Sequence, residues 1–343
     1  MTRELDLTFT RAMTDWYGQN KRELPWRRDK DPYHIWVSEI MLQQTRAAAV
    51  RDYYTRFMEK LPAVKDLAEA DEETLLKLWQ GLGYYNRIRN MHKAAAVIQN
   101  DLGGHFPQTY EAIKALPGIG DYTAGAIASI CFDQRVAAVD GNVLRVMSRI
   151  CEDYEDVKSA AMKKRTAAYL QALYPERQCG DFTQSLIELG ALICVPKGQP
   201  KCGLCPAGDY CKARAAGTTG LLPVKSGKKE RRKVEKTVFI LRCGHKNAVR
   251  KRGKAGLLAG LYEFPNVDRR MTAEEAVKQV EEWGCQPRDL QRKAEYRHVF
   301  THVEWEMTGY YLSCDSENAQ FQWASEKELE EEIPIPSAFG YFI

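Results

Sequence analysis

The hydrophobic pattern of the chain changes its period late in the sequence. From about Leu7 to Arg214, apolar residues recur at the 3.6-residue spacing of amphipathic helices, and Gly and Pro mark the turns between them. Thr237–Cys243 instead has the composition of a β-strand. A chain of 343 residues is also longer than one typical core supports. The pattern therefore predicts an all-α domain followed by a smaller α+β domain.

The predicted boundaries lie where this pattern breaks. We expect a helical domain, a basic linker and an α+β domain, at residues 1–216, 217–236 and 237–343. In the last of these, Thr272 to Trp283 predicts an amphipathic helix that Thr272 caps, with Glu275 three residues on. Glu295 to Ser313 alternates in polarity, which predicts one long strand or a hairpin.

The net charge of +4 is too small to identify a partner, so the distribution of charge matters more. Lys225 to Lys236 is strongly basic, whereas Glu326 to Glu332 is acidic and is interpreted as a solvated face or tail. No apolar stretch approaches the ~20 residues that span a bilayer, and Met1 to Thr10 lacks the apolar core of a secretion signal. These features argue against a membrane protein and against a secreted one.

Four of the ten cysteines are clustered, with seven, two and five residues between successive members: Cys194, Cys202, Cys205 and Cys211. A long chain without a secretion signal favours a reducing compartment, where such a cluster indicates a metal centre rather than disulfides. Zinc and an iron–sulfur cluster both accept four cysteines, and the spacing does not separate them. Lysines and arginines around the cluster would let this loop present cations to phosphates.

A tight turn between two helices is predicted at Leu116-Pro-Gly-Ile-Gly120. Gly118 and Gly120 would let the backbone approach a phosphate without a Cβ in the way. The helix from Asp121 to Ile130 would add free N–H donors at its first turn. An ordinary helix–helix turn explains the same residues, so this segment alone does not decide between the two interpretations.

Two carboxylates stand where acid–base chemistry could use them. Asp140 precedes a helical pattern, so it is an N-cap, a charge facing a cationic transition state, or both. Glu39 lies on a helix that is apolar in almost every direction, and burial would raise its pKa as a general acid requires. A buried ion pair with an arginine is the structural alternative for Glu39. One acidic and one ionised carboxyl group is the arrangement used in glycoside hydrolysis.

Amide and aromatic side chains nearby could contact nucleic-acid bases. Gln43 and Gln44 lie on the same predicted helix as Glu39, and their amides could enter a duplex. Tyr84 and Tyr85 could stack on bases or wedge between them. Ordinary packing explains each of these residues equally well when it is taken singly.

Taken in order, these motifs resemble the helix-hairpin-helix DNA glycosylases, and in particular the MutY family of adenine DNA glycosylases. The motifs that carry the resemblance, which covers nearly the whole chain, are Leu24-Pro-Trp-Arg27, Val37-Ser-Glu-Ile-Met-Leu-Gln-Gln-Thr45, Gly81-Leu-Gly-Tyr-Tyr85, Leu116-Pro-Gly-Ile-Gly120, Val139-Asp-Gly-Asn-Val143, the four cysteines, Gly256-Leu-Leu-Ala-Gly-Leu-Tyr-Glu-Phe-Pro265 and Phe300-Thr-His302. The resemblance implies a mainly α helix-hairpin-helix domain with an iron–sulfur loop at 194–211, and an α+β Nudix-like C-terminal domain.

The resemblance also implies a reaction: hydrolysis of the N-glycosidic bond of adenine mispaired with 8-oxoguanine or guanine in duplex DNA. Glu39 matches the acid that protonates adenine at N7, and Asp140 matches the carboxylate that stabilises the oxocarbenium ion or bonds to it. Asn142 would orient Asp140, and Tyr122 would line the pocket. The four cysteines would bind a 4Fe-4S cluster that supports a DNA-binding loop and takes no redox part in base removal.

The Nudix-like domain would read 8-oxoguanine through the Phe300-Thr-His302 motif. The residues expected to contact DNA are Gln43, Gln44, Tyr84, Gly118, Gly120, Gly260, Phe300, Thr301 and His302. The helix from Ala273 to Gly284 lacks the Arg-Glu pair of a working Nudix metal helix, so we expect no pyrophosphatase activity.

The chain departs from the family pattern at two points. Seven residues separate Cys194 from Cys202, where the family usually has six, and this would shift the DNA contacts of the loop. Thr301 stands where many members have serine, so the hydroxyl is kept and a methyl group is added.

Two other functions stay open. A bifunctional glycosylase/lyase resembling endonuclease III attacks the sugar with a lysine, which aligns with Tyr122 here. A phenol cannot form the Schiff base, so we predict a monofunctional enzyme. A non-enzymatic, metal-clipped DNA-binding protein would leave Glu39 and Asp140 unexplained. We expect a cytoplasmic, nucleoid-associated bacterial monomer that binds duplex DNA and no membrane.

Overall fold

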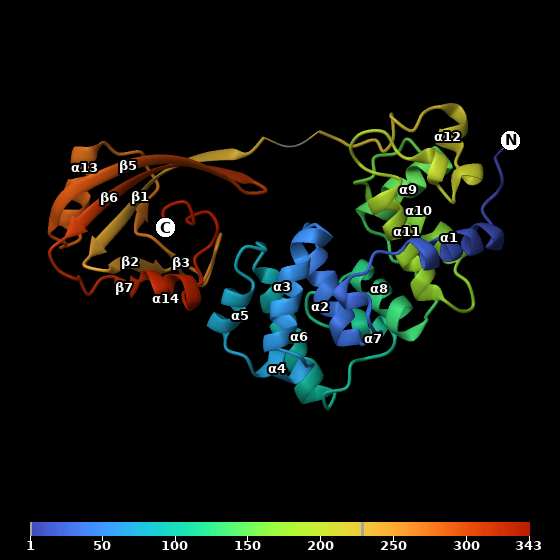
Figure 1. Ribbon diagram of the computed structural model, residues 1–343, viewed down its shortest axis with the longest axis horizontal. Helices are drawn as coiled ribbons and strands as arrows, with labels where there is room; N and C mark the ends of the chain where they lie inside the picture. Colours follow the sequence, from blue (N-terminus) through green and yellow to red (C-terminus); the bar gives the residue numbers. More distant parts are fainter. Residues whose placement is uncertain (1, 228–229) are drawn as a thin grey trace. The chain divides into compact units, whose positions relative to one another are not determined.

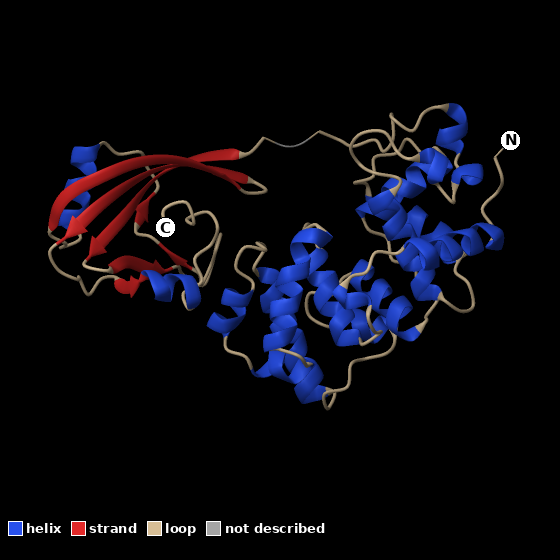
Figure 2. Ribbon diagram, viewed as in Figure 1, coloured by secondary structure: helices blue, strands red, loops and turns tan. Residues whose placement is uncertain are grey.

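The computed structural model describes residues 2–227 and 230–343, which form two compact units. The helical unit comprises the described residues up to Glu69 together with Asn90–Gly227. The sheet unit comprises Ala70–Arg89 together with the described residues from 230 to 343. Residues 228–229, inside the basic run, lie outside the described residues. Figure 2 shows the helices of the first unit and the strands of the second, which confirms a mainly α part followed by an α+β part.

The helical unit is built from helices joined by short connections (Figure 1). In chain order its elements are α1 (Leu7–Asn20), η1 (Pro25–Arg27), α2 (Pro32–Leu42), α3 (Ala47–Lys60), α4 (Val64–Glu69), α6 (Asn86–Asp101), α7 (Tyr110–Lys114), α8 (Asp121–Phe132), α9 (Gly141–Cys151), α10 (Ala160–Gln171), α11 (Cys179–Leu192), η2 (Cys202–Leu204), η3 (Gly208–Tyr210) and α12 (Lys212–Ala216). Helix α6 begins inside the Ala70–Arg89 segment of the sheet unit.

Helices α2 and α8 are enclosed by the rest of the helical unit. Helix α8 packs against α2, α7 and α11, and every residue from Thr123 to Ile130 is buried. Helix α2 is buried from Ile35 to Met41. A helix that is apolar all round must be surrounded by protein, so the one charged side chain within that stretch of α2 is buried with it. A further apolar cluster joins α1, α9, α10 and α11 to the cysteine-bearing loop.

The sheet unit is a mixed sheet with helices beside it (Figure 1). Its elements are α5 (Glu72–Leu78), β1 (Arg232–Cys243), β2 (Lys246–Lys251), β3 (Tyr262–Glu263), β4 (Asn266–Val267), α13 (Ala273–Glu282), β5 (Pro287–Val299), β6 (Val303–Cys314), β7 (Gln322–Ser325) and α14 (Glu326–Glu331). The strand order is β3-β2-β1-β6-β5, with β4 beside β1 and β7 beside β2. Strands β1 and β6 are parallel, and the other pairs are antiparallel.

Side chains along β1 alternate between two apolar faces of the sheet. Val238 and Ile240 belong to one cluster, which includes Phe339 near the end of the chain. Phe239 belongs to the opposite cluster, which includes residues of α13. Both faces of the sheet are therefore covered, and this explains why the middle of β1 is apolar at every position rather than at every second one.

Several predicted elements of the sheet unit are confirmed. The strand predicted at Thr237–Cys243 is part of β1, which begins at Arg232, inside the span expected to be linker. The predicted amphipathic helix is α13, and Thr272 and Glu275 form its capping box. The bounds of the three predicted ranges themselves stay predictions.

For two other segments of the sheet unit, the sequence left two structures open, and the structure shows one of them in each case. Glu295 to Ser313 is part of a hairpin of β5 and β6, because residues 300–302 turn the chain between the two strands. The acidic run forms α14, whose glutamates are exposed while Leu329 is buried. No helix among the described residues is both long and apolar enough to span a membrane.

Candidate active site

Glu39, Tyr122 and Asp140 form a polar group inside the helical unit. Glu39 lies on α2, Tyr122 lies in the first turn of α8, and Asp140 directly precedes α9. The Tyr122 hydroxyl donates a hydrogen bond to Glu39 Oε2 over 2.8 Å. Only 8 % of the Glu39 surface is exposed. The packing of α2 against α8 therefore brings two of the predicted catalytic residues into direct contact.

Burial raises the pKa of Glu39 to about 7. The hydrogen bond from Tyr122 and the charge of Arg27 lower that pKa, while the Asp140 carboxylate raises it further. Burial dominates because a carboxylate loses its hydration among apolar helices. Near neutral pH, Glu39 is thus divided between its acid and carboxylate forms, and it keeps a proton that an ordinary glutamate has already lost.

Asp140 caps α9, as one of its two predicted roles requires. Its Oδ1 accepts a hydrogen bond from the backbone N–H of Val143 over 2.7 Å, and its Oδ2 accepts one from Asn142 Nδ2 over 2.7 Å. Burial raises the pKa of Asp140, and these hydrogen bonds to the charged form oppose the rise. Both oxygens are held in place, so capping and a fixed charge next to Glu39 are compatible.

Arg145 connects this carboxylate to the cysteine-bearing loop, and the sequence interpretation missed it. Its Nη2 donates to Asn142 Oδ1 over 2.9 Å and to the Gly190 carbonyl oxygen over 2.8 Å. Its Nε donates to the Cys194 carbonyl oxygen over 2.9 Å. A chain of hydrogen bonds therefore runs from Asp140 through Asn142 and Arg145 to the first cysteine of the cluster. The available signal was the i,i+3 spacing of Asn142 and Arg145 on one helix.

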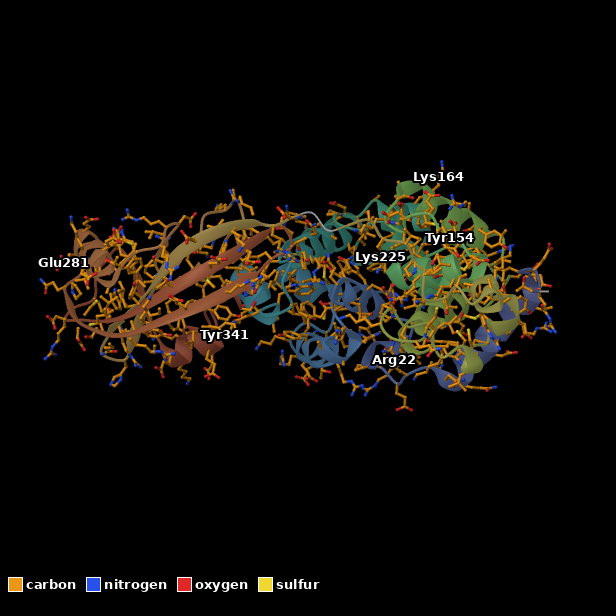
Figure 3. All side chains as sticks on the ribbon, turned by 90° about the horizontal axis from the view of Figure 1, so that it is seen from above. Arg22, Tyr154, Lys164, Lys225, Glu281 and Tyr341 are labelled. Carbon is orange, nitrogen blue, oxygen red and sulfur yellow. The ribbon has the colours of Figure 1, made fainter. Side chains whose placement is uncertain are left out.

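A buried ion pair near Glu39 was also missed. Glu188 on α11 is fully buried, and Arg22 and Arg27 each bind it through two guanidinium nitrogens, over 2.7 to 3.1 Å. Although burial opposes it, hydrogen bonding to these two arginines lowers the pKa of Glu188 to about 2. Arg22, labelled in Figure 3, is the more exposed of the two. The ion pair considered as the structural alternative for Glu39 is instead made by Glu188, and burial rather than an arginine has the largest influence on the pKa of Glu39.

The four cysteines line one cavity in the helical unit, together with Arg149 and Arg214. Arg149 Nη1 donates to Cys194 Sγ over 3.2 Å, and the Cys211 thiol donates to the Arg149 carbonyl oxygen over 3.4 Å. A Cβ on Gly208 would overlap the Arg214 guanidinium, so the loop is tightly folded around the cavity. Four sulfur donors facing one space, with the buried Arg149 and the exposed Arg214 beside them, fit a four-cysteine centre. Within the described part of the chain, no set of three or more His, Cys, Asp or Glu side chains is placed around a single metal ion.

Gly118 and Gly120 occupy the turn between α7 and α8, and their surroundings differ. Gly118 has φ +76°, and a Cβ there would stand 2.5 Å from Asn90 Cβ. Gly120 is the N-cap of α8 with φ −97°, and a Cβ there would meet nothing within 4 Å. Gly118 is therefore required by the fold itself, whereas the open space at Gly120 leaves room for a ligand at the start of α8.

The surroundings of Gly118 make a stability prediction. Gly118→Ala should lower the unfolding free energy of the helical unit by roughly 1–2 kcal/mol or more, because alanine is disfavoured at positive φ and its methyl would collide with Asn90. Gly18→Ala is the matched control on the exposed face of α1, where it should stabilise by about 0.5–1 kcal/mol. Thermal unfolding of the two variants should therefore shift in opposite directions, and equal shifts would contradict this account of Gly118.

The prediction that Gln43 and Gln44 lie on the Glu39 helix is wrong. Helix α2 ends at Leu42, and both glutamines lie in the turn that follows. Gln44 has φ +61° and is exposed, while Gln43 Nε2 approaches Thr123 Oγ1 at 3.5 Å. The helix ends there because Gln44 adopts a left-handed conformation, which the helical pattern of the residues did not indicate. Gln44 is still presented outward, as a DNA contact would require.

The candidate lesion-reading residues lie in the sheet unit. The turn between β5 and β6 carries Phe300, which packs edge-on against the buried Trp305 with 4.8 Å between ring centroids. The next two residues of the turn, Thr301 and His302, are exposed. Tyr84 is 48 % exposed and its hydroxyl lies 2.6 Å from Thr301 Oγ1. The fold thus brings Tyr84 and Thr301 together from positions far apart in the sequence.

Comparison with known families agrees with this arrangement. A model of the HhH-GPD superfamily of base excision DNA repair proteins matches residues 37–173, and a model of the NUDIX domain matches residues 237–343. A solved thermostable thymine-DNA glycosylase superposes with a TM-score of 0.54 at 30 % identity, covering 61 % of this chain and 96 % of its own. The fold is therefore that of a DNA glycosylase of the base-excision class.

Curated relatives narrow this class. The rat adenine DNA glycosylase is 35 % identical over 90 % of this chain and 71 % of the rat protein. The adenine DNA glycosylase of Buchnera aphidicola subsp. Baizongia pistaciae is 32 % identical over 87 % of this chain and 84 % of its own length. This chain belongs to the adenine DNA glycosylase family.

Proposed function

We propose that this chain is a monofunctional glycosylase that removes adenine paired with 8-oxoguanine or guanine in duplex DNA. The observation that carries the proposal is a buried carboxyl group with a pKa of about 7, Glu39, next to a carboxylate whose two oxygens are fixed, Asp140. A proton donor and a stationary negative charge are the two groups that cleavage of a glycosidic bond needs. The 8-oxoguanine partner is the finer part of the proposal and is argued from the sheet unit.

The reaction follows from these two groups. The adenine leaves the base stack and enters the pocket, as enzymes acting on bases require. Glu39 transfers its proton to adenine N7, and the bond between N9 and C1′ breaks with both electrons going to the base. The oxocarbenium ion that forms at C1′ is stabilised by the Asp140 carboxylate or trapped as a covalent ester with it. Water then adds to C1′ and gives up one proton, which leaves an abasic site and neutral adenine.

Tyr122 supports a hydrolytic enzyme over a lyase. Its hydroxyl donates to Glu39, and burial together with the neighbouring carboxylates raises its pKa well above the usual value, so it stays a neutral donor. A phenol cannot form an imine with C1′ of the sugar. We therefore expect that borohydride, added during turnover, traps no covalent enzyme–DNA adduct, as judged by gel electrophoresis against an enzyme with a catalytic lysine. Efficient trapping would contradict a monofunctional mechanism.

Thr301 and Tyr84 are the groups proposed to read 8-oxoguanine. Their hydroxyls are 2.6 Å apart and both side chains reach solvent, so one of them can exchange its partner for the altered edge of the base. The contact between the Phe300 and Trp305 rings anchors the β5–β6 turn to the buried core of the sheet unit. The extra methyl of Thr301, relative to serine, would add an apolar contact in the same place. Gly260 and His302 stay predicted DNA contacts.

The cysteine cavity is proposed to hold a 4Fe-4S cluster, with Cys194, Cys202, Cys205 and Cys211 as ligands. When bound, such a cluster supplies structural rigidity and local charge to the loop rather than chemistry at the sugar. Arg149 and Arg214 lie in the wall of the cavity and would face its negative charge. The hydrogen bonds of Arg145 to the Cys194 carbonyl and to Asn142 would then tie the orientation of Asp140 to the integrity of this loop.

This assignment makes a metal prediction. The purified protein should be brown and contain about four iron atoms per chain. Cys205→Ser should remove the visible absorption and weaken duplex binding by about tenfold or more, since a disordered loop loses its phosphate contacts. Cys243→Ser, in the sheet unit and outside the cavity, is the control and should keep iron and binding. A colourless, zinc-loaded and fully active protein would rule out the cluster.

The proposed function as a whole is tested by single-turnover release of adenine from two duplexes that differ only in having 8-oxoguanine or guanine opposite the adenine. We expect release from both and faster release opposite 8-oxoguanine. Thr301→Val, which removes the hydroxyl at constant shape, should narrow that difference. Tight duplex binding without any adenine release would instead favour the non-enzymatic, metal-clipped DNA-binding protein. The monomeric state and the nucleoid location stay predictions.

A further inference from the structure

Ala70–Arg89, called here the docking segment, lies within the region that the base-excision family model matches, yet it belongs to the sheet unit. It contains α5 and the turn that ends in Tyr84. Its apolar residues Leu75, Leu76 and Trp79 are buried. A segment matched by the HhH-GPD model is therefore packed with residues matched by the NUDIX model.

Two cations of the docking segment bind backbone carbonyl groups of the NUDIX-matched region. Lys77 Nζ donates to the carbonyl oxygens of Leu329 and Ile333, over 3.1 and 3.2 Å. Arg89 Nη2 donates to the carbonyl oxygen of Ala259 over 2.5 Å. A charged donor to a fixed carbonyl is a directional contact, and it contributes more to stability than a hydrogen bond between neutral groups. These contacts fix the docking segment at α5 and at its last residue.

Carboxylates of the same segment complete the arrangement. Glu72 Oε1 accepts from Arg89 Nε over 2.8 Å, which orients the guanidinium toward Ala259. Glu73 Oε1 accepts from Lys251 Nζ over 2.6 Å and from the Tyr262 hydroxyl over 3.3 Å. The Glu73–Lys251 pair is about half exposed, so it contributes little by itself. It is therefore a secondary contact beside the two cationic anchors.

Gly260 is explained by the Arg89 anchor. Its φ is +69°, and a Cβ there would stand 3.0 Å from Arg89 Nη2. A side chain at this position would push the guanidinium away from the neighbouring Ala259 carbonyl. The glycine predicted as a DNA contact therefore also has a structural task inside the sheet unit, because it leaves the space that Arg89 occupies.

The docking segment also carries Tyr84, a strained and exposed residue. Tyr84 has φ +49° and follows Gly83, whose carbonyl oxygen accepts hydrogen bonds from Trp79 Nε1 and Arg87 Nη2 over 3.1 and 3.0 Å. The Tyr84 hydroxyl then meets Thr301. A lone hydrogen bond between exposed hydroxyls contributes less to stability than those charged contacts, because water competes for it. The position of Tyr84 is therefore set by the anchors rather than by its contact with Thr301.

We propose that Arg89 and Lys77 are positioning residues for lesion recognition, which hold the docking segment so that Tyr84 and Thr301 meet before DNA arrives. The proposal rests on the proposed function, in which these two hydroxyls read 8-oxoguanine. Neither anchor touches the base. Each acts by removing the conformational freedom that Tyr84 would otherwise lose on binding, and a pre-ordered site binds more tightly for that reason.

The test compares the wild type with Arg89→Met and Lys77→Met, each of which keeps an unbranched apolar stem and removes the hydrogen-bond donor. The measured quantity is the single-turnover rate constant divided by the half-saturating DNA concentration, for 8-oxoguanine:adenine and guanine:adenine duplexes. We divide the value for the 8-oxoguanine:adenine duplex by the value for the guanine:adenine duplex. We expect either variant to lower this ratio by about tenfold, because the value for the 8-oxoguanine:adenine duplex falls. The value for guanine:adenine should change little.

Lys327→Met, on the neighbouring α14, is the matched control, because Lys327 is exposed and contacts only Glu331 of its own helix among the described residues. It should leave the ratio unchanged. A merely stabilising role of the anchors would lower both duplex values together and leave their ratio as in the wild type. That outcome in both variants would overturn the proposal while leaving the proposed function intact.

A double-mutant comparison shows whether Arg89 acts through the hydroxyl pair. In a Thr301→Val background, Arg89→Met should lower the ratio no further, because the contact that it positions is already gone. Independent, additive losses would contradict the proposal. If the wild type itself shows no preference for 8-oxoguanine, the lesion-reading part of the proposed function fails and the positioning role fails with it.

Discussion

Glu39→Gln should release adenine about 10²–10⁴-fold more slowly than the wild type in single turnover, because it removes the transferable proton of the general acid. Glutamine has nearly the same shape, and its amide oxygen can still accept the hydrogen bond from Tyr122. The variant should therefore fold and bind duplex DNA like the wild type. Release of adenine should be measured by chemical quench with enzyme in excess over DNA, and an unchanged rate would remove Glu39 from the mechanism.

The pH dependence of the same rate follows from the pKa of Glu39. The wild-type rate should fall as pH rises above about 7, since the protonated form of Glu39 is lost there. The raised pKa means that the folded protein holds this proton in a range where the unfolded chain has released it. Stability contributed by the group is therefore present at low pH and is lost as pH rises through the folded value. In Glu39→Gln both dependences on this group should disappear.

Asp140→Asn should have the second large effect, on the order of 10²–10³-fold in the single-turnover rate, because it removes the negative charge next to the oxocarbenium ion. Asparagine caps helices about as well as aspartate, so the bond to the Val143 N–H can be retained. This substitution separates the two roles that the sequence left joined at Asp140. The thermal unfolding temperature should stay close to that of the wild type while adenine release collapses.

Asp140→Ser is the matched control for that separation. Serine also caps helices well, so it keeps the structural role and removes the carboxylate by a different route. Both variants should lose activity with little change in stability. If Asp140→Asn kept most of its activity, or lost activity only together with its fold, the carboxylate would be a cap and no more.

The sequence predicted the burial of Glu39 and the cap at Asp140 because both depend on local patterns. An apolar helix around Glu39 implies burial, and a carboxylate before a helical pattern at Asp140 implies a cap with a fixed direction. The structure has both features. The resemblance placed Asn142 and Tyr122 beside them, and both lie within hydrogen-bonding distance of those carboxylates.

Local sequence patterns could not predict contacts between segments that are far apart in the chain. Nothing local to Arg145 indicates that it binds carbonyl groups on α11 and the cysteine loop, and Glu188 carries no mark of the two arginines that neutralise it. The end of α2 was misplaced because a left-handed backbone at Gln44 is a tertiary choice that helix propensity does not report. The hairpin at residues 295–313 was left open because a polar turn of three residues resembles the polar positions of a strand.

The discontinuity of the sheet unit has a consequence for how the protein comes apart. A single cut between Pro223 and Gly227 breaks the polypeptide but leaves Ala70–Arg89 bonded at both ends to the helical unit. The two fragments should stay together in a native gel and separate only in denaturant. A genetic truncation at the same place would instead leave Lys77 and Arg89 without the backbone carbonyl groups that they bind. The NUDIX-matched region is thus tied to the rest of the chain by its contacts with Ala70–Arg89 as well as by the linker.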